Sequence, residues 1–147
     1  ADEPTSALDV VVQRLIMQTL RQVQARLDSA VIIIGHDMGL MAQFVDRLAV
    51  MYAGKIVEIA PIKPFFHNPL HPYSKLLIAS VPSTEQRRTL AALPGSQPPL
   101  ARLPSGCAFH PRCPLATDRC RTEVPALRRI TDERVAACHL VEEAPNG

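Results

Sequence analysis

Apolar residues recur at helical spacing in the first third of the chain. Between Val10 and Leu27 they fall three or four positions apart, and glutamine and arginine occupy most of the positions between them. Asp9 comes directly before this stretch, and an aspartate there is a favourable N-cap. The pattern predicts an amphipathic helix over residues 10–27 that packs on a sheet, and a shorter helix over residues 37–45 by the same reasoning.

Shorter apolar runs predict strands. Residues 31–34 are β-branched without polar alternation, as in a central strand of a parallel sheet that is covered on both faces. Residues 47–52 and 55–59 flank an Ala-Gly turn and predict two strands. Pro72 is expected to begin a helix, because proline is tolerated in a first turn. Residues 82–105 are rich in proline, show little periodicity and predict a linker.

Composition allows one ordinary hydrophobic core. Hydrophobic residues make up 47% of the 147 residues and the formal net charge is +2. The longest aliphatic block, residues 30–34, is much too short to cross a bilayer, so a membrane role is expected to come through a partner. No signal peptide is recognised.

Acidic and imidazole side chains follow the predicted strands. Asp2 and Glu3 precede Pro4 as at a strand end, and His36 follows the strand at residues 31–34. Ligands of open α/β sheets bind beyond the carboxyl ends of the strands, so these side chains are expected at one rim. Phosphoryl transfer to water requires a metal clamp, a positioned water and a donor to the phosphate oxygens, which these side chains could supply. Taken singly, Asp2 and Glu3 could instead form a solvated turn, and His36 could be a structural residue.

The order of several motifs resembles one family. ADEPTSALD, GHD, VDRLAVMYAGKIVE, FFHNPLHPYSKLLIASVP and GCAFHPRCPLATDRC together resemble the C-terminal portion of the ATP-binding subunit of ABC importers of the oligopeptide/dipeptide type. The resemblance implies an α/β fold in which residues 1–60 are the C-terminal part of a RecA-like P-loop nucleotide-binding domain. Residues 61–105 would be a Pro-rich helix and linker arm, and residues 106–147 a small module with a four-cysteine cluster site.

The resemblance also implies roles for individual residues. Asp2 would hold the Mg²⁺ of Mg-ATP, Glu3 would orient the attacking water, and His36 would sense the γ-phosphate. Ser6 and Asp9 would belong to a loop at the interface of a nucleotide-sandwich dimer. The implied protein is an ATPase on the cytoplasmic face of the membrane that energises uptake of oligopeptides or dipeptides.

The implied partners are a second ATPase subunit or domain, membrane-spanning permease subunits and, indirectly, an extracytoplasmic binding protein. Relatives with similar ATPases carry peptides, nickel complexes or oligosaccharides, so peptides are only the default substrate.

The phosphate loop GxxxxGK[ST] does not occur in these 147 residues, nor does the family's signature loop. The chain is therefore expected to be the C-terminal part of a longer polypeptide and to hydrolyse no ATP by itself. An alternative is a non-catalytic metal-binding or redox-sensing regulatory fragment that docks on a transporter partner.

Four cysteines lie in the last third of the chain: Cys107, Cys113, Cys120 and Cys138. Disulfides are rare in the reducing cytoplasm, so four thiolates suggest a metal centre. Zinc and an iron-sulfur cluster both accept four cysteines, and the wide spacing without a CxxC pair slightly favours the cluster. The resemblance adds weight to a [4Fe-4S] cluster, with Zn²⁺ as the alternative. Reduced, merely buried cysteines are a further alternative.

Two histidines and six arginines accompany the cysteines. His110 and His139 could substitute as ligands, although four cysteines make this unnecessary. The arginines between residues 106 and 140 outnumber the acidic residues and could offset an anionic cluster. Phe109 is the only aromatic residue in that stretch and no nucleic-acid-binding motif accompanies it, so no nucleic-acid partner is expected.

Overall fold

The computed structural model describes residues 1–81 and 95–142. These residues form two compact units, which divide between Asp46 and Arg47. Within the described residues no helix is both long and apolar enough to span a membrane. The part of the predicted linker between residues 82 and 94 lies outside the described residues.

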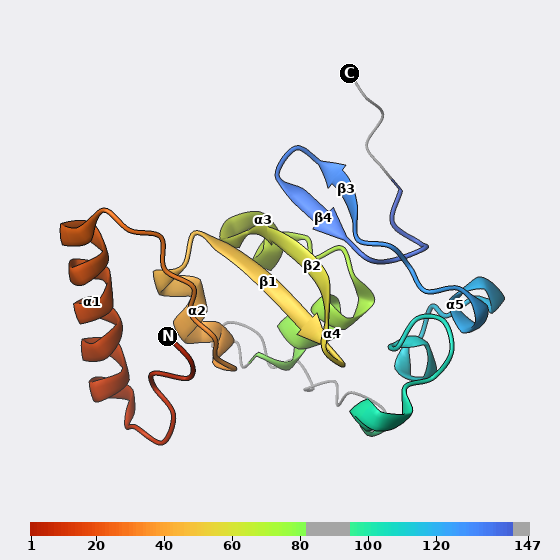
Figure 1. Ribbon diagram of the computed structural model, residues 1–147, viewed down its shortest axis with the longest axis horizontal. Helices are drawn as coiled ribbons and strands as arrows, with labels where there is room; N and C mark the ends of the chain where they lie inside the picture. The colour runs from red at the N-terminus through yellow and green to blue at the C-terminus, as the bar shows by residue number, and fades with distance from the viewer. Residues whose placement is uncertain (82–94, 143–147) are drawn as a thin grey trace. The chain divides into compact units, whose positions relative to one another are not determined.

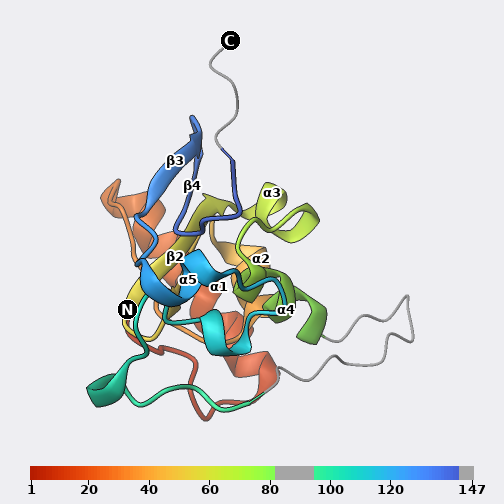
Figure 2. The same ribbon diagram turned by 90° about the vertical axis from the view of Figure 1, so that its right-hand side faces the viewer.

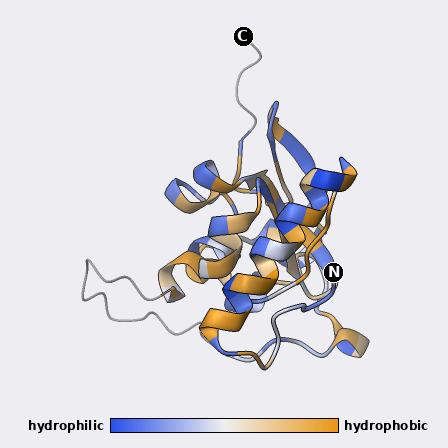
Figure 3. Ribbon diagram, turned by 90° about the vertical axis from the view of Figure 1, so that its left-hand side faces the viewer, coloured by the Kyte–Doolittle hydropathy of each residue, from blue (hydrophilic) through white to orange (hydrophobic). Residues whose placement is uncertain are grey.

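Two capped helices dominate the first unit. Helix α1 spans Val10–Leu27, and the Asp9 carboxylate accepts hydrogen bonds from two amides of its first turn. Helix α2 spans Met38–Phe44 and begins at Asp37, whose side chain accepts from the amide of Leu40. Both predicted helices are confirmed, but the expected packing of α1 on a sheet is not: the described residues of the first unit contain only an isolated bridge, and α1 contacts α2 and buries Met17. Hydrophobic and hydrophilic residues are interspersed along α1 (Figure 3), and several of its apolar residues are exposed in the described unit.

The predicted strand over residues 31–34 is wrong in its extent. Only Ile34 is in β-structure, in an isolated parallel bridge with Asp2. Ile32 is 81% exposed, so this run is not covered on both faces in the described unit. A strand needs a ladder of hydrogen bonds, and here the run has partners on only one side, from residues 1–3.

A four-stranded antiparallel sheet organises the second unit (Figure 1). Its order is β1-β2-β4-β3, with β1 at Arg47–Tyr52, β2 at Lys55–Pro61, β3 at Arg128–Thr131 and β4 at Arg134–Ala136. The predicted β1–β2 hairpin is confirmed. Ala53 and Gly54 turn it with φ of 49° and 76°, the positive pair that a type I′ turn requires. The pairing of β2 with β4 joins the cysteine-containing segment to this hairpin.

Short helices connect the strands. Helix α3 spans Ile62–His67 and was not predicted as a separate helix, and α4 spans Pro72–Ser80 and begins at Pro72 as predicted. Residues 95–127 run mainly as loops with short helical turns (Figure 2): η1 at Leu100–Arg102, η2 at His110–Arg112 and α5 at Asp118–Thr122.

A buried carboxylate fixes the start of α4. Glu58 on β2 is fully buried and accepts hydrogen bonds from the amides of Leu70 and His71. Arg134 on β4 completes the arrangement with an ion pair of 3.1 Å to the Glu58 carboxylate. A buried charge is tolerated only when it is paired and hydrogen-bonded in this way. Glu58 thereby ties both central strands to the turn before α4.

An aromatic cluster packs the cysteine-containing loop against this turn. Phe109 is 1% exposed and contacts the rings of Tyr52 and Tyr73 edge-on or tilted, with centroids 5.1 and 5.4 Å away. The His71 ring lies 5.8 Å from Phe109, and its Nδ1 accepts a hydrogen bond from the Tyr73 amide. His71 therefore caps α4 and packs against the loop that carries Cys107.

We expect His71 to make the second unit sensitive to acid. Burial lowers its pKa from 6.5 to about 4, while the Glu58 charge acts in the opposite direction. Above pH 6.5 the folded and unfolded states are both neutral at this residue. As pH falls from 6.5 toward 4, only the unfolded state gains a proton, so stability decreases by about 3 kcal/mol.

Urea unfolding followed by circular dichroism between pH 7 and 4 measures this loss. His71→Asn keeps an N-cap acceptor but removes the titrating ring, so the variant is expected to lose less stability over the same interval. Identical pH dependence in the two proteins would contradict the assignment.

Candidate functional site

The acidic pair and the histidine come together at a backbone bridge in the first unit. The amide of Glu3 donates to the carbonyl of Ile34, and the amide of Ile34 donates to the carbonyl of Ala1, both at 2.9 Å. This pairing is parallel, so Glu3 and His36 both follow the bridged residues on the same side. The predicted convergence of Asp2, Glu3 and His36 is present in the backbone.

The Glu3 carboxylate lies between two polar partners. Its Oε1 is 3.5 Å from His36 Nδ1, and its Oε2 accepts a hydrogen bond of 2.5 Å from the Ser6 hydroxyl. The Ser6 hydrogen bond, and then His36, lower the pKa of Glu3 from 4.5, so the carboxylate is ionised at neutral pH. Glu3 thus satisfies one requirement of a group that accepts a proton or polarises water.

The backbone of this loop is unusual at Glu3. Its φ is 43°, in the left-handed region that non-glycine residues seldom occupy, and Ala7 follows at 59°. Such strain tends to gather where a side chain must be held for function. Ser6 makes two hydrogen bonds to Glu3 in this turn. Its hydroxyl donates to the Glu3 carboxylate, and its amide donates to the Glu3 carbonyl at 3.1 Å.

The other predicted nucleotide-site residues have simpler surroundings. Asp2 is exposed beside the bridge, so its carboxylate is accessible to a cation. The Asp9 carboxylate is occupied as the N-cap of α1, with Oδ1 2.9 and 3.0 Å from the two amides that it accepts. The capping interaction fixes the end of the loop that contains Ser6.

The four cysteines are brought to one part of the second unit by three segments. The amide of Cys107 donates to the carbonyl of Cys120 at 2.9 Å, which joins the first loop to α5. Cys113 is linked to the first loop through its amide, which donates to the carbonyl of His110. Cys138 follows β4, where the Ala137 amide donates to the carbonyl of Val57.

A glycine permits the closest of these approaches. Gly106 has a φ of 68°, and a Cβ there would lie 2.4 Å from the backbone oxygen of Cys120. Neither the conformation nor the space suits any other residue. Gly106 therefore allows Cys107 and Cys120 to be held side by side through their backbones.

The thiols affect one another electrostatically. Burial raises the pKa of Cys113, and each of the other three cysteines contributes to the same direction. Burial likewise raises the pKa values of Cys107 and Cys138. All four are unbridged thiols, and Cys120 and Cys138 are 6% and 7% exposed. The donor set is thus the one that zinc and iron-sulfur centres use.

The thiols are not already arranged around an ion. Across residues 1–81 and 95–142, no three histidine, cysteine, aspartate or glutamate side chains form a group that could hold a metal ion. The cysteines expected to hold a [4Fe-4S] cluster are thus present as thiols, but the described side chains do not form a ready-made ligand group for a metal. A single zinc ion holds sulfurs at about 2.3 Å, so the thiols would have to close in to bind it.

The two histidines near the cysteines contact backbone oxygens. His110 Nδ1 lies 3.0 Å from the carbonyl oxygen of Cys107, and His139 Nε2 lies 3.0 Å from that of Glu123. Each ring therefore has one nitrogen directed at the main chain. These contacts suit histidines that support the loops near the thiols.

Sequence reasoning overlooked the groups that connect the cysteine segment to the sheet. Glu58 and Arg134 are 76 residues apart, and nothing in either local sequence indicates that they pair. Lys55 and Lys75 were also missed, although each lines a pocket that contains a cysteine. Their positions depend on long-range pairing of β2, β4 and α4, for which no short motif exists.

Comparisons with known proteins agree with these observations. Residues 57–120 match the family described as oligopeptide/dipeptide transporter, C-terminal region. The match includes most of β2, the turn before α4 and three of the four cysteines.

Similar proteins cover nearly the whole chain. It is 44% identical over 140 residues to the dipeptide transport ATP-binding protein DppD of Escherichia coli (strain K12), covering 95% of this chain and 43% of that protein. It is 47% identical over 142 residues to the probable peptide ABC transporter ATP-binding protein y4tS of Sinorhizobium fredii, covering 95% and 40%.

A third relative, the di/tripeptide transport ATP-binding protein DppF of Pseudomonas aeruginosa, is 39% identical over 145 residues, covering 97% of this chain and 45% of the relative. The chain thus spans less than half the length of these relatives. The resemblance read from the motifs is confirmed: the chain is a relative of the ATP-binding proteins of peptide ABC transporters, and residues 57–120 belong to the oligopeptide/dipeptide transporter C-terminal region family.

Proposed function

We propose that this chain is part of the ATP-binding and ATP-hydrolysing subunit of an ABC importer that energises uptake of oligopeptides or dipeptides. The observation that carries the proposal is the 3.5 Å approach of His36 to the Glu3 carboxylate across the bridge between Asp2 and Ile34. The names of the relatives supply the substrate class. Residues 1–60 would complete a RecA-like nucleotide-binding domain.

The proposed roles follow from the chemistry of each side chain. The exposed Asp2 carboxylate would bind the Mg²⁺ that accompanies ATP, because hard cations prefer oxygen ligands. Ionised Glu3, held by Ser6, would accept a proton from the attacking water or orient it. His36 would donate to the oxygens of the transferred phosphoryl group. The loop from Ser6 to Asp9 would meet a second nucleotide-binding subunit.

We propose that Cys107, Cys113, Cys120 and Cys138 hold a [4Fe-4S] cluster, with zinc as the alternative metal. Support comes from four unbridged thiols that influence one another and are anchored by β4, α5 and the Phe109 loop. When bound, the group would cross-link these segments or respond to redox conditions. Residues 61–105 would connect this centre, within residues 106–147, to the nucleotide-binding part.

The partners and location belong to the same proposal. A second ATPase subunit, membrane-spanning permease subunits and an extracytoplasmic binding protein would complete the importer, and the ATPase would lie peripherally on the cytoplasmic face. No specific observation favours the alternative of a non-catalytic regulatory fragment.

The test is ATP turnover by a polypeptide of the relatives' length that carries these residues, compared with the present chain alone. We expect turnover by the longer protein and none by the 147-residue chain, because a phosphate loop is needed to hold the nucleotide. A folded full-length protein without turnover in the presence of its permease would contradict the proposal.

A further inference from the structure

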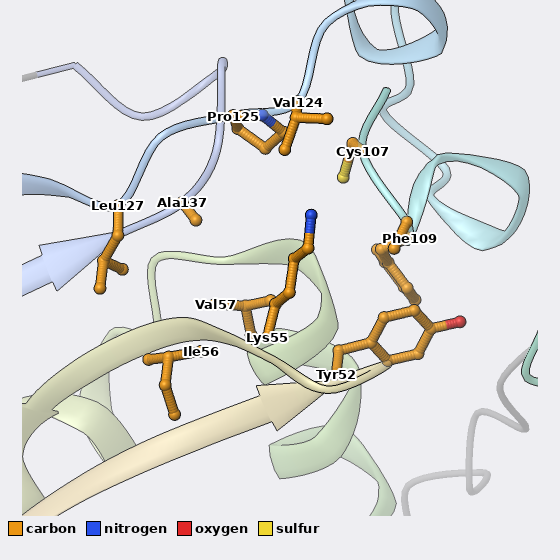
Figure 4. A pocket seen from close by; sticks show the side chains of 11 residues that line it. Tyr52, Lys55, Ile56, Val57, Cys107, Phe109, Val124, Pro125, Leu127 and Ala137 are labelled. Atoms are coloured by element: carbon orange, nitrogen blue, oxygen red, sulfur yellow. The ribbon is translucent and has the colours of Figure 1, made fainter. Parts of the chain in front are cut away.

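An apolar pocket lies between the start of β2 and the loop that carries Cys107 (Figure 4). Its volume is about 310 Å³, at the lower end of the range of about 300–1,000 Å³ that small-molecule sites occupy. Apart from Tyr52, Lys55 and Cys107, every residue that lines it has a hydrocarbon side chain. The pocket is therefore suited to a small ligand with an apolar body.

Packing holds part of the pocket wall in place. Tyr52 and Phe109 both line the pocket, are 2% and 1% exposed, and contact each other edge-on with ring centroids 5.1 Å apart. The Ala137 amide donates to the carbonyl of Val57, and this hydrogen bond joins two further lining residues. A ligand would meet a wall that is already ordered, so binding would cost little conformational entropy in the protein.

Another part of the wall is uncovered. Val124 and Leu127 line the pocket and are 57% and 46% exposed. Removing apolar surface from water is favourable in proportion to the area covered. A hydrocarbon chain in the pocket would cover these side chains and gain free energy from doing so.

Lys55 is the only charged residue that lines the pocket. Its side chain extends from β2 into the space between the walls (Figure 4). Across residues 1–81 and 95–142, its amine has no carboxylate within ion-pair distance and makes no hydrogen bond. The pocket thus offers one cation to a ligand and no protein anion that would compete for it.

This charge pattern favours one class of ligand. An amino acid or short peptide carries an ammonium group as well as a carboxylate, and no acidic residue lines this pocket to receive the ammonium. Two other pockets in the described chain contain charges of both signs, from Lys75 and Glu142 in one and from Arg119 and Glu123 in the other. One cation among hydrocarbon side chains matches an apolar molecule with a single negative charge.

We propose that this pocket binds an unbranched medium-chain carboxylate, with the hydrocarbon chain against the apolar wall and the carboxylate on the Lys55 amine. The site lies in the second unit alone, and the inference rests neither on the ATPase role nor on the metal centre. Cys107 contributes to the wall and forms no bond to the ligand. Because the ligand binds the folded chain, it stabilises the association of β2 with the Phe109 loop.

The test is isothermal titration calorimetry of the full chain with butanoate, hexanoate and octanoate. Each added methylene is expected to tighten binding by about fourfold, because each buries further apolar surface in the pocket. Octanol has the same chain without the charge, and it should bind about tenfold more weakly than octanoate because it makes no charge-assisted hydrogen bond.

Variants separate the charge from the apolar wall. Lys55→Gln should weaken octanoate binding by about tenfold and leave octanol binding unchanged, whereas Lys55→Arg should bind octanoate as the wild type does. Ala108→Leu enlarges a lining side chain and should weaken the binding of both ligands. Lys63→Gln on α3 removes a lysine that does not line the pocket and should change neither affinity.

Three results would overturn the proposal. The first is the absence of octanoate binding to wild-type chain with normal circular dichroism. The second is equal affinity of wild type and Lys55→Gln for octanoate, which would show that the amine does not receive the carboxylate. The third is tighter binding of the dipeptide alanyl-leucine than of octanoate, which would assign the pocket to peptides instead.

Discussion

Glu3→Gln is expected to lower the rate of ATP hydrolysis by about 10²- to 10⁴-fold in a polypeptide of the relatives' length, while ATP still binds. Glutamine has nearly the same shape and can accept the Ser6 hydrogen bond, but it carries no negative charge. Hydrolysis loses the group that accepts the proton or orients the water, whereas the phosphate contacts remain.

Steady-state turnover and equilibrium binding of ATP, measured on the same preparation, separate these effects. Glu133→Gln makes the same chemical change at an exposed carboxylate in the β3–β4 turn and should hydrolyse ATP at the wild-type rate. Turnover by Glu3→Gln within a few-fold of wild type would refute the catalytic assignment. Loss of ATP binding would instead give Glu3 a role in holding the nucleotide.

Cys120→Ser is expected to remove most of the bound metal and to loosen the second unit. Cys120 is buried on α5, and its carbonyl also accepts the amide of Cys107, so it joins two of the three thiol segments. Serine leaves three thiolates and places a hydroxyl where the sulfur was. Because metal binding to a structural site contributes directly to folding stability, the unfolding midpoint should fall along with the metal content.

Metal analysis and thermal unfolding of anaerobically prepared protein measure both effects. Ala136→Ser buries a comparable hydroxyl in β4 but removes no thiol, so this control can be destabilised and should still bind metal. Unchanged metal content in Cys120→Ser would show that this thiol is not a ligand.

Local signals in the sequence predicted the elements that depend on neighbouring residues. Asp9 is the N-cap of α1, and Pro72 is the first residue of α4. Ala53 and Gly54 form the hairpin turn with positive φ angles. Each of these features is decided within a few residues by capping, turn geometry or the fixed φ of proline. The grouping of Glu3 with His36 was also predictable, because parallel pairing places both after the same bridge.

Features that depend on distant residues were not predictable. The pairing of β2 with β4 unites residues more than seventy positions apart, and the weak β-propensity of a three-residue strand gives little warning of it. The run at residues 31–34 shows the opposite error, since its composition predicted a covered strand but only Ile34 pairs. Helix α3 was not predicted because prolines usually interrupt helices, but Pro64 occupies its first turn, where proline is tolerated.

The most direct test of the central claim is a double-mutant cycle of Glu3→Gln and His36→Ala, with ATP turnover as the readout in a polypeptide of the relatives' length. If the two side chains act as a unit on one bound nucleotide, the double variant should be hardly slower than the slower single variant. If the losses multiply, or if either single variant retains wild-type turnover, the two residues do not form the catalytic site proposed for this chain.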